Sequence, residues 1–321
     1  MTLFLHFLLV VVGFVMLIKG AEALVNGASS LAKRFHVPDL AIGLTIVALG
    51  TSAPELVVNV LSGTDGHPEV VFGNIIGSNI FNLFLILGVA GAIYPLPVQR
   101  STVMRELPFS LFITLLLFYL TNDELFNGED FNRTSLLDGI ILLGFFAIFL
   151  WYVFGSLKRR PPHQVSKIRV YSSIGIAARL LFGLMGLGFG GKFVVDNAIA
   201  IAQAFEVSEK LVGLTIIAAG TSLPELATSA VAAYKRQADI AIGNVVGSNI
   251  FNILLVLGVT TVVTPLDYDT ALNTDVFILL SGTVLLLVFM FTINKKKLDR
   301  WESLLYLAAF IGYMIYLFIR K

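Results

Sequence analysis

The 321-residue sequence contains no cysteine, and only 13% of its residues are charged. Without cysteine the chain forms no disulfide and offers no thiolate to a metal ion. Soluble domains carry about a quarter charged residues, so this shortage of charge argues against a water-soluble protein. The formal net charge is +1, which is not the strongly basic balance of a nucleic-acid-binding protein. We therefore expect no nucleic-acid partner.

Apolar residues take the place of the missing charges: 57% of the chain is hydrophobic, and the mean hydropathy is +0.88. They come in blocks of about twenty, the length that crosses a bilayer as a helix. The sequence therefore predicts an all-α membrane protein with ten transmembrane helices, embedded in lipid. The predicted spans are 3–33, 38–63, 70–94, 104–121, 135–155, 171–204, 208–233, 239–264, 274–293 and 300–319.

The loops between these spans alternate in charge. One set, which includes the longest loop at 156–170, holds 15 of the 22 Lys and Arg residues. The other set, together with both termini, holds four of them and most of the loop acids. Basic loops face the cytoplasm by the positive-inside rule, so both termini are predicted to be extracellular. An even number of spans satisfies this, and we expect a multi-pass protein of the cell membrane.

Two blocks of the first half of the sequence recur in the second half at one constant offset. The segment 43–56 (GLTIVALGTSAPEL) matches 213–226 (GLTIIAAGTSLPEL) at 11 of 14 positions. The segment 73–82 (GNIIGSNIFN) matches 243–252 (GNVVGSNIFN) at 8 of 10. The identities concentrate in polar and helix-breaking residues rather than in apolar filler, which favours a functional repeat over a silent duplication.

The offset between the two copies spans five predicted helices. Because five is odd, the second copy enters the membrane upside down. The predicted organisation is a five-helix repeat at 1–155, a cytoplasmic linker at 156–170 and an inverted five-helix repeat at 171–321. Inverted repeats are typical of secondary transporters, which bind their substrate near the midplane where the repeats meet.

Glu55 and Glu225 are repeat equivalents, and each lies within long apolar sequence. A charged carboxylate at the bilayer centre costs at least about 2.5–3.5 kcal/mol on insertion scales, so both need a compensating partner. Inverted symmetry lets only residues near the midplane meet their equivalents. Two converging carboxylates repel each other unless cations or protons lie between them. We therefore interpret this pair as the centre of a cation site.

The residues around the two glutamates supply further oxygen atoms. Pro54 and Pro224 lack an N–H and clash with the carbonyl four residues earlier, so both helices should break there. In lipid, freed carbonyls are tolerated where they line a cavity or find ligands. Ser78 and Asn82 lie four residues apart on one predicted helix face, as do Ser248 and Asn252. Such an all-oxygen set suits Ca²⁺ and also Na⁺, and is less suited to Mg²⁺.

These repeated blocks resemble the alpha repeats of the cation/Ca²⁺ antiporter superfamily, and most closely those of its prokaryotic sodium/calcium exchangers. The first motif lies in 43–82 and the second in 213–252, and the likeness extends over nearly the whole chain. It implies a Na⁺/Ca²⁺ antiporter, not an enzyme, with Ca²⁺ and Na⁺ as transported ions and no cofactor. We expect the chain to act as a monomer.

The resemblance also implies roles for individual residues. Glu55 and Glu225 would be the principal Ca²⁺ ligands, and Asn82 and Asn252 would lie beside them. The remaining expected ligands are the carbonyls of Thr51 and Thr221 for Ca²⁺, and for flanking Na⁺ sites Ser52, Ser78, Ser222 and Ser248 with the carbonyls of Ala48 and Ala218.

This sequence departs from the family pattern at one position. Many of these exchangers carry Asp where this chain has Asn252, and the potassium-dependent members share that Asp pattern. With amides at both Asn82 and Asn252, the site offers two negative charges and no third carboxylate. This argues against potassium dependence and leaves the number of Na⁺ ions per Ca²⁺ open.

Two other functions remain compatible with the residues. H⁺/Ca²⁺ exchange would use the same scaffold, with protons neutralising the glutamates. A cation channel could also use carbonyls and acidic groups as a filter, although a pair of broken helices is more typical of one closed site.

Overall fold

The computed structural model describes residues 3–35, 37–126, 128, 131–156, 171–204, 218–292 and 296–319. These parts of the chain are helical apart from short turns and four strands of two residues each. Eight of the helices are long and apolar enough to cross a membrane, and up to nine spans result if a bent pair of helices counts as one. The chain is therefore an all-α membrane protein.

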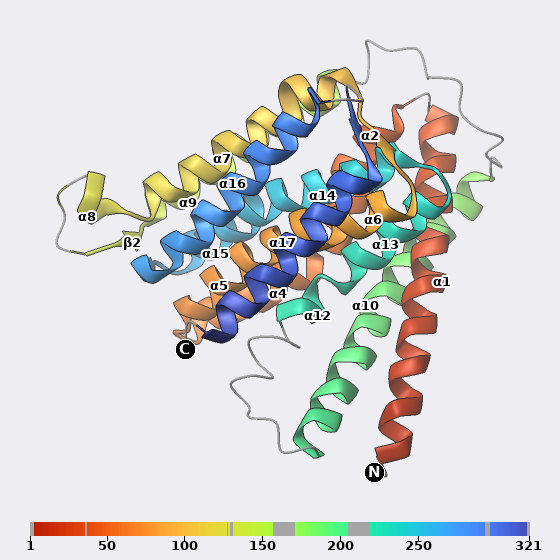
Figure 1. Cartoon of the computed structure of the whole chain (residues 1–321), viewed down its shortest axis with the longest axis horizontal. Coiled ribbons are helices and arrows are strands. Elements are labelled where there is room, and N and C mark those ends of the chain that lie inside the picture. The colour runs from red at the N-terminus through yellow and green to blue at the C-terminus, as the bar shows by residue number, and fades with distance from the viewer. Residues whose placement is uncertain are drawn as a thin grey trace.

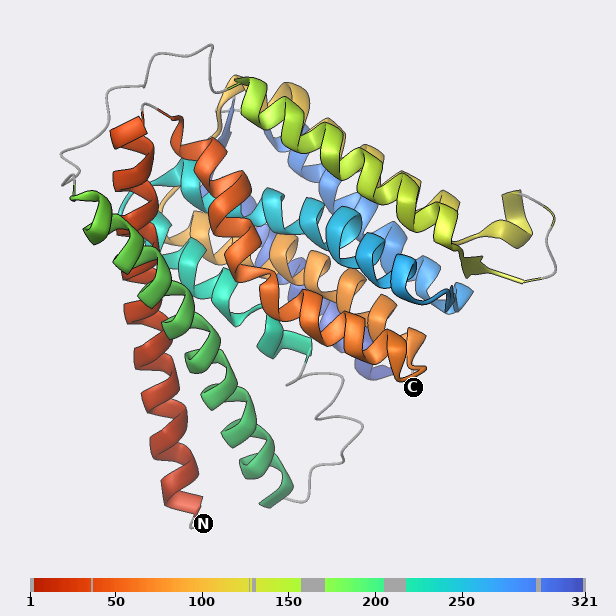
Figure 2. The same cartoon turned by 180° about the vertical axis from the view of Figure 1, so that it is seen from behind.

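The first and sixth predicted spans form a long helix pair. Helices α1 (Leu3–Phe35) and α10 (Ser173–Ala204) lie side by side and project from the rest of the bundle (Figures 1 and 2). Glycines allow this close approach: a Cβ atom at Gly20 would lie 2.8 Å from the backbone nitrogen of Leu187. The two long helices therefore pack backbone against backbone along one seam.

The two spans that carry the glutamates are broken, as the prolines predict. In the second span the helix axis bends by 46° at Ser52. In the seventh, Ser222 interrupts the helix, and the predicted part at 208–217 lies outside the described residues. The pieces are α2 (Asp39–Ile42), η1 (Gly43–Val47), α3 (Ala48–Thr51) and α4 (Ala53–Thr64) in the second span, and α12 (Ala218–Thr221) and α13 (Leu223–Tyr234) in the seventh.

The third and eighth spans each contain a π-helical segment that the sequence analysis did not predict. The segments η2 (Phe81–Ile86) and η6 (Asn252–Leu257) lie near equivalent positions of the two repeat copies. The third span is completed by α5 (Pro68–Ile80) and α6 (Leu87–Ile93), the eighth by α14 (Ala238–Phe251) and α15 (Gly258–Val263).

Helix α14 forms the centre of the bundle. It crosses the second span at two glycines, because Cβ atoms built on Gly43 and Gly243 would each lie about 3 Å from the other residue's Cα. Gly247 likewise packs against Leu44 and Ala48. Gly243 and Gly247 are therefore close-packing positions, whereas a Cβ atom at their equivalents Gly73 and Gly77 would meet no atom within 4 Å.

The outer helices cover this centre and expose large apolar side chains, as a lipid-facing surface requires. Helix α9 packs on α15, α17 packs on α6, and α16 packs on α7. The helix of the ninth span ends at Phe289, short of the predicted end at 293. The bounds are η3 (Thr102–Glu106), α7 (Leu107–Leu120), α9 (Leu136–Ser156), α16 (Asn273–Phe289) and α17 (Arg300–Ile319).

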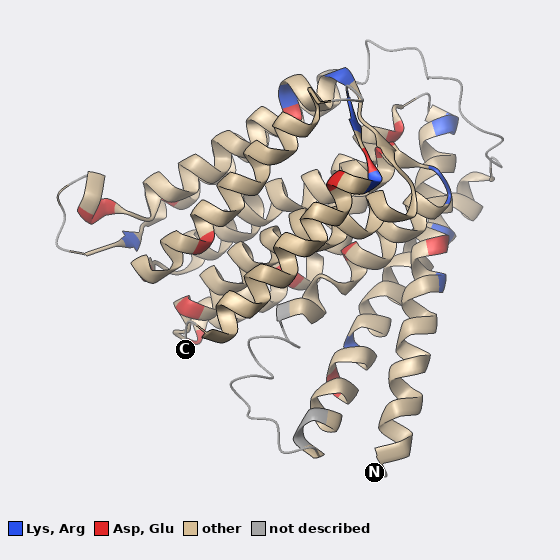
Figure 3. Ribbon diagram, viewed as in Figure 1, with Lys and Arg blue, Asp and Glu red and all other residues tan. Residues whose placement is uncertain are grey.

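Two short strand pairs join loops that are distant in sequence. Strand β1 (Leu96–Pro97) pairs antiparallel with β4 (Lys297–Leu298), and β2 (Arg133–Thr134) pairs antiparallel with β3 (Leu266–Asp267). The small elements α8 (Asp123–Phe126) and η7 (Thr270–Leu272) lie in the loops. In Figure 3 most Lys and Arg residues gather at the end of the bundle that carries β1 and β4.

Candidate cation site

Glu55 and Glu225 each lie in the first turn of a helix that restarts after a break. Glu55 is the third residue of α4, and Glu225 is the third residue of α13. Proline is favoured at this end of a helix, because the N–H it lacks would be unpaired there. Unpaired N–H groups and the helix dipole favour a negative charge at the same end. The sequence thus places each carboxylate where its own helix stabilises it.

Serines bring the two glutamates together across the repeat. Ser52, at the break of the second span, donates to Oε1 of Glu225 at 3.1 Å. Ser222, at the break of the seventh span, donates to Oε1 of Glu55 at 3.4 Å. Ser248 of α14 also donates to Oε1 of Glu225, at 3.4 Å. Each carboxylate therefore accepts a hydrogen bond from the broken helix of the opposite copy.

Both carboxylates are deeply buried, with 1% of each residue exposed. They are close enough to repel each other when both are charged. Oε2 of Glu55 and Oε2 of Glu225 have no hydrogen-bond partner among the described residues. No ion pair joins either glutamate to a lysine or arginine in the same parts of the chain. The site is therefore a buried pair of acids that lacks a basic partner there.

The hydroxyl groups of the two threonines reach asparagine side chains of the opposite copy. Thr51 donates to Oδ1 of Asn244 at 3.1 Å, and Thr221 donates to Oδ1 of Asn74 at 3.2 Å. Asn74 also accepts a hydrogen bond from Ser78 at 3.3 Å. Each threonine hydroxyl is therefore tied to an asparagine of the other repeat copy.

Ala48 and Ala218, whose carbonyls are expected Na⁺ ligands, lie at the first residues of α3 and α12. The carbonyl oxygen of Ala48 accepts from the backbone N–H of Ser52 at 2.9 Å and from the Thr51 hydroxyl at 3.3 Å. An ion at Ala48 would thus share a carbonyl that already accepts the backbone hydrogen bond of Ser52 and competes with Asn244 for the single Thr51 proton.

Asn82 and Asn252 are buried as well, with 1% of each residue exposed. Each donates its Nδ2 to another asparagine: Asn82 to Asn249 and Asn252 to Asn79, both at 3.0 Å. The Oδ1 atoms of Asn82 and Asn252 have no hydrogen-bond partner in the described parts of the chain. Two further oxygen atoms are therefore available beside the glutamates' helices.

Sequence reasoning missed the asparagines that support the site. Asn74, Asn244, Asn79 and Asn249 all lie inside the repeated blocks, and each bonds to a residue of the opposite copy. Their repetition was visible in sequence, because both blocks contain the same asparagines. Their partners were not visible, because each partner lies in the other half of the chain.

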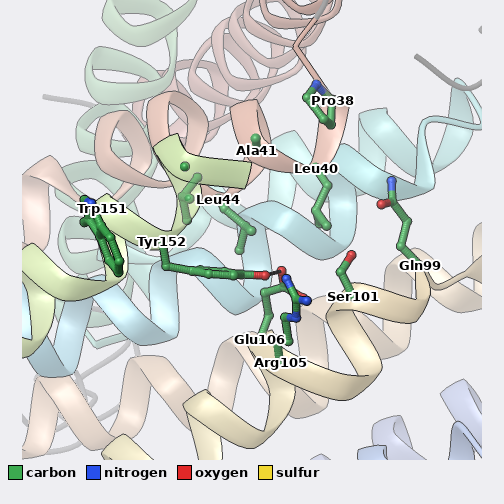
Figure 4. Close-up of a pocket in the computed structure, with 12 residues that line it drawn as sticks. Pro38, Leu40, Ala41, Leu44, Gln99, Ser101, Arg105, Glu106, Trp151 and Tyr152 are labelled. Atoms are coloured by element: carbon green, nitrogen blue, oxygen red, sulfur yellow. Dashed lines mark hydrogen bonds between the residues drawn. The ribbon is translucent and has the colours of Figure 1, made fainter. Parts of the chain in front are cut away.

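A cavity of about 340 Å³ lies elsewhere, among the start of the second span, η3 and the end of α9. Figure 4 shows Glu106 and Tyr152 facing each other inside it, with Arg105 beside them. The Tyr152 hydroxyl donates to Oε1 of Glu106 at 2.6 Å. The guanidinium of Arg105 lies 5.8 Å from the centre of the Tyr152 ring. Neither Glu55 nor Glu225 lines this cavity, so it is separate from the glutamate pair.

A membrane-embedded helical fold with a buried, all-oxygen acidic site is the arrangement of a transporter rather than an enzyme. The profile of the family described as "Sodium/calcium exchanger protein" matches residues 5–155 and 176–319. The chain belongs to this family and is a cation/Ca²⁺ antiporter.

Relatives of full length support this assignment. The chain is 37% identical to the putative antiporter CaxA of Alkalimonas amylolytica, over 96% of this chain and 97% of the relative. It is 28% identical to the sodium/calcium exchanger MaX1 of Methanosarcina acetivorans, over 98% of both chains. A solved structure of the sodium-calcium exchanger NCX_Mj, soaked with Na⁺ and Ca²⁺, matches with a TM-score of 0.82 at 29% identity and covers 97% of this chain and 98% of its own.

Proposed function

We propose that this protein exchanges Na⁺ for Ca²⁺ across the cell membrane by alternating access. The observation that carries the proposal is the buried glutamate pair, in which each carboxylate accepts a hydrogen bond from the broken helix of the opposite copy. The names of the relatives agree with it, since MaX1 and NCX_Mj are sodium/calcium exchangers.

Glu55 and Glu225 are the proposed Ca²⁺ ligands, because their unpartnered oxygens are buried and negative. The carbonyls of Thr51 and Thr221 complete the Ca²⁺ shell, and Asn82 and Asn252 lie beside it. The proposed flanking Na⁺ sites use Ser52, Ser78, Ser222 and Ser248 with the carbonyls of Ala48 and Ala218.

The charge of this site couples the two ion fluxes. Two ionised glutamates give it a charge of −2, which one Ca²⁺ or two or more Na⁺ neutralise. An empty site leaves both charges unpaired in a medium of low dielectric constant. The change between outward-facing and inward-facing states is therefore strongly disfavoured without cations, which suppresses leak.

The proposed architecture is ten spans in two inverted five-helix repeats, 1–155 and 171–321, joined by a cytoplasmic linker at 156–170. Matching breaks at Ser52 and Ser222 and matching π segments support the repeat. The nine candidate spans become ten when the seventh predicted span is added. The first part of that span lies outside the described ranges. Both termini are extracellular in this proposal, and the gathering of basic residues at one end of the bundle agrees with it.

A single chain supplies both glutamates and all of the serines that contact them. The site therefore requires no residue from a second copy. We propose that the monomer is the transporting unit and that the bilayer and the transported ions are its partners.

The test is Ca²⁺ uptake into proteoliposomes with one gradient imposed at a time. With pH clamped on both sides, an outward Na⁺ gradient should drive Ca²⁺ in, whereas K⁺ and Li⁺ gradients should not. A second candidate function is H⁺/Ca²⁺ exchange. Because positions 82 and 252 carry amides, only the two glutamates would need protons to neutralise the site. Uptake under a pH gradient but not under a Na⁺ gradient would favour it, and Ca²⁺ flux without a counter-ion would favour a channel.

A further inference from the structure

Four buried asparagines form a cluster where the third and eighth spans meet. They are Asn79 and Asn82 and their repeat equivalents Asn249 and Asn252, and none is more than 5% exposed. All four hydrogen bonds that their side chains donate within the group run from one repeat copy to the other. We call this group the amide cluster.

A backbone carbonyl fixes the orientation of Asn249. The Nδ2 of Asn249 donates to the carbonyl oxygen of Asn79 at 3.3 Å. Because a carbonyl only accepts, the amide nitrogen of Asn249 must face it, and Oδ1 of Asn249 is left for another donor. That donor is the Nδ2 of Asn82, at 3.0 Å. The orientation of Asn82 therefore follows from that of Asn249.

The other half of the amide cluster repeats the arrangement. The Nδ2 of Asn79 donates to the carbonyl oxygen of Asn249 at 3.3 Å, and Oδ1 of Asn79 accepts from the Nδ2 of Asn252 at 3.0 Å. The amide of Asn82 is therefore held by Asn249, and the amide of Asn252 by Asn79. Each holding asparagine is itself fixed by a hydrogen bond to a backbone carbonyl of the opposite copy.

The consequence appears at the oxygen atoms of Asn82 and Asn252. An amide is planar, so fixing the direction of its nitrogen fixes that of its oxygen. Both Oδ1 atoms are buried and have no hydrogen-bond partner within the described ranges. A carbonyl oxygen is a suitable ligand for a hard cation, whereas an N–H group repels one.

We propose that Asn79 and Asn249 are positioning residues that make positions 252 and 82 present oxygen, rather than N–H, to the cation. This inference rests on the proposed function and adds residues that were not among the expected ligands. It also gives a reason for an amide at position 252: only its NH₂ group can donate to Oδ1 of Asn79, whereas an ionised aspartate would place oxygen against oxygen.

The Asn82→Asp substitution tests the orientation directly, because it replaces the amide, which has one oxygen and one nitrogen, by a carboxylate with two equivalent oxygens. The measurement is ⁴⁵Ca²⁺ binding to the purified full-length protein. Asn249→Ala should weaken binding about tenfold, because it releases the amide of Asn82 and leaves a buried group unpaired. In the Asn82→Asp background, either carboxylate oxygen can face the cation and the other lies against Oδ1 of Asn249, so Asn249→Ala should no longer weaken binding.

The matched control uses the asparagine that does not hold Asn82. Asn79→Ala should weaken binding by the same factor with or without Asn82→Asp, because Asn79 orients Asn252 instead. The mirror experiment, Asn79→Ala with and without Asn252→Asp, should reproduce the selective rescue. Thermal stability of every variant, measured alongside, separates lost folding from lost orientation.

An equal loss on Asn249→Ala in both backgrounds, or no loss in either, would overturn the positioning role while leaving Ca²⁺ transport intact. If the protein without any substitution bound no Ca²⁺, that result would instead contradict the proposed function and, with it, this inference.

Discussion

Ser52 donates a hydrogen bond of 3.1 Å to a carboxylate oxygen of Glu225, a residue 173 positions later in the chain. The equivalent contact joins Ser222 to Glu55. The residue at each helix break thus holds the acid of the other copy. A movement of one broken helix relative to the other must therefore change the surroundings of both glutamates, which is the physical link between ion binding and conformation.

Glu55→Gln and Glu225→Gln are each expected to abolish Na⁺-driven Ca²⁺ uptake while the protein still folds. Each change removes half of the site's negative charge, and a neutral amide no longer balances a divalent cation. Proteoliposome flux measures the loss, and size-exclusion chromatography reports folding. The control is Glu22→Gln, which removes a partly exposed carboxylate of α1 that pairs with Lys19. Unchanged flux in either site variant would refute the role of the pair.

Ser52→Ala and Ser222→Ala should weaken Ca²⁺ binding without preventing expression. Each removes a hydrogen bond to a charged group, worth about 1.5–3 kcal/mol, so the expected loss is roughly ten- to hundredfold. Isothermal titration with Ca²⁺ gives the affinity. Ser110→Ala provides the matched control, because Ser110 is a buried serine on α7, outside the broken helices. If Ser110→Ala weakened Ca²⁺ binding as much as Ser52→Ala and Ser222→Ala do, the loss would not be caused by the hydrogen bonds between the repeat copies.

Gly20→Ala should destabilise the seam between α1 and α10. The added Cβ would lie 2.8 Å from the backbone nitrogen of Leu187 and 2.9 Å from the carbonyl oxygen of Gly183, so the helices must separate. Overpacking of this kind typically costs about 1–3 kcal/mol. Thermal unfolding in detergent should show a lower Tm.

Gly188→Ala is the control for the glycine seam, because a Cβ there meets no atom within 4 Å although the residue lies on the same helix, α10. Its Tm should equal or exceed that of the unchanged protein, since alanine favours helix by about 1 kcal/mol over glycine. Equal Tm values for both variants would show that the seam tolerates separation.

Tyr152→Phe should destabilise the protein without altering the ions it transports. It removes the 2.6 Å hydrogen bond to the buried carboxylate of Glu106, at a cost of about 1–3 kcal/mol. A lowered Tm with unchanged Ca²⁺ affinity is the expected pair of results, because the Glu106 cavity is separate from the glutamate pair. Tyr119→Phe, at an exposed tyrosine of α7, supplies the comparison. A loss of Ca²⁺ affinity in Tyr152→Phe would show that the two regions are coupled.

Much of the fold was accessible from sequence because lipid allows few solutions for a backbone. A span must satisfy its hydrogen bonds internally, so helix follows from an apolar run of sufficient length. The predicted span 135–155 corresponds to α9 (Leu136–Ser156), and the predicted breaks before Pro54 and Pro224 occur at Ser52 and Ser222. The longest error among the described ends was in the ninth span, whose helix stops at Phe289 where a turn precedes β4.

The face shared by Ser78 and Asn82 illustrates where local reasoning stops. A spacing of four predicts one helix face, but a π segment begins at Phe81 and alters the angle per residue. Ser78 bonds back to Asn74, while Asn82 bonds across to Asn249. The two residues therefore share a helix without sharing a partner.

The amino-acid order alone determined that the chain enters a membrane, where its helices break and that one acid recurs at the same place in each repeat copy, because each of these can be read along the sequence itself. Only the tertiary structure decided which oxygen atoms are left without partners. That outcome depends on Asn79, Asn249 and the serines reaching across from the opposite copy, and such contacts are fixed by how the two halves pack rather than by any local pattern.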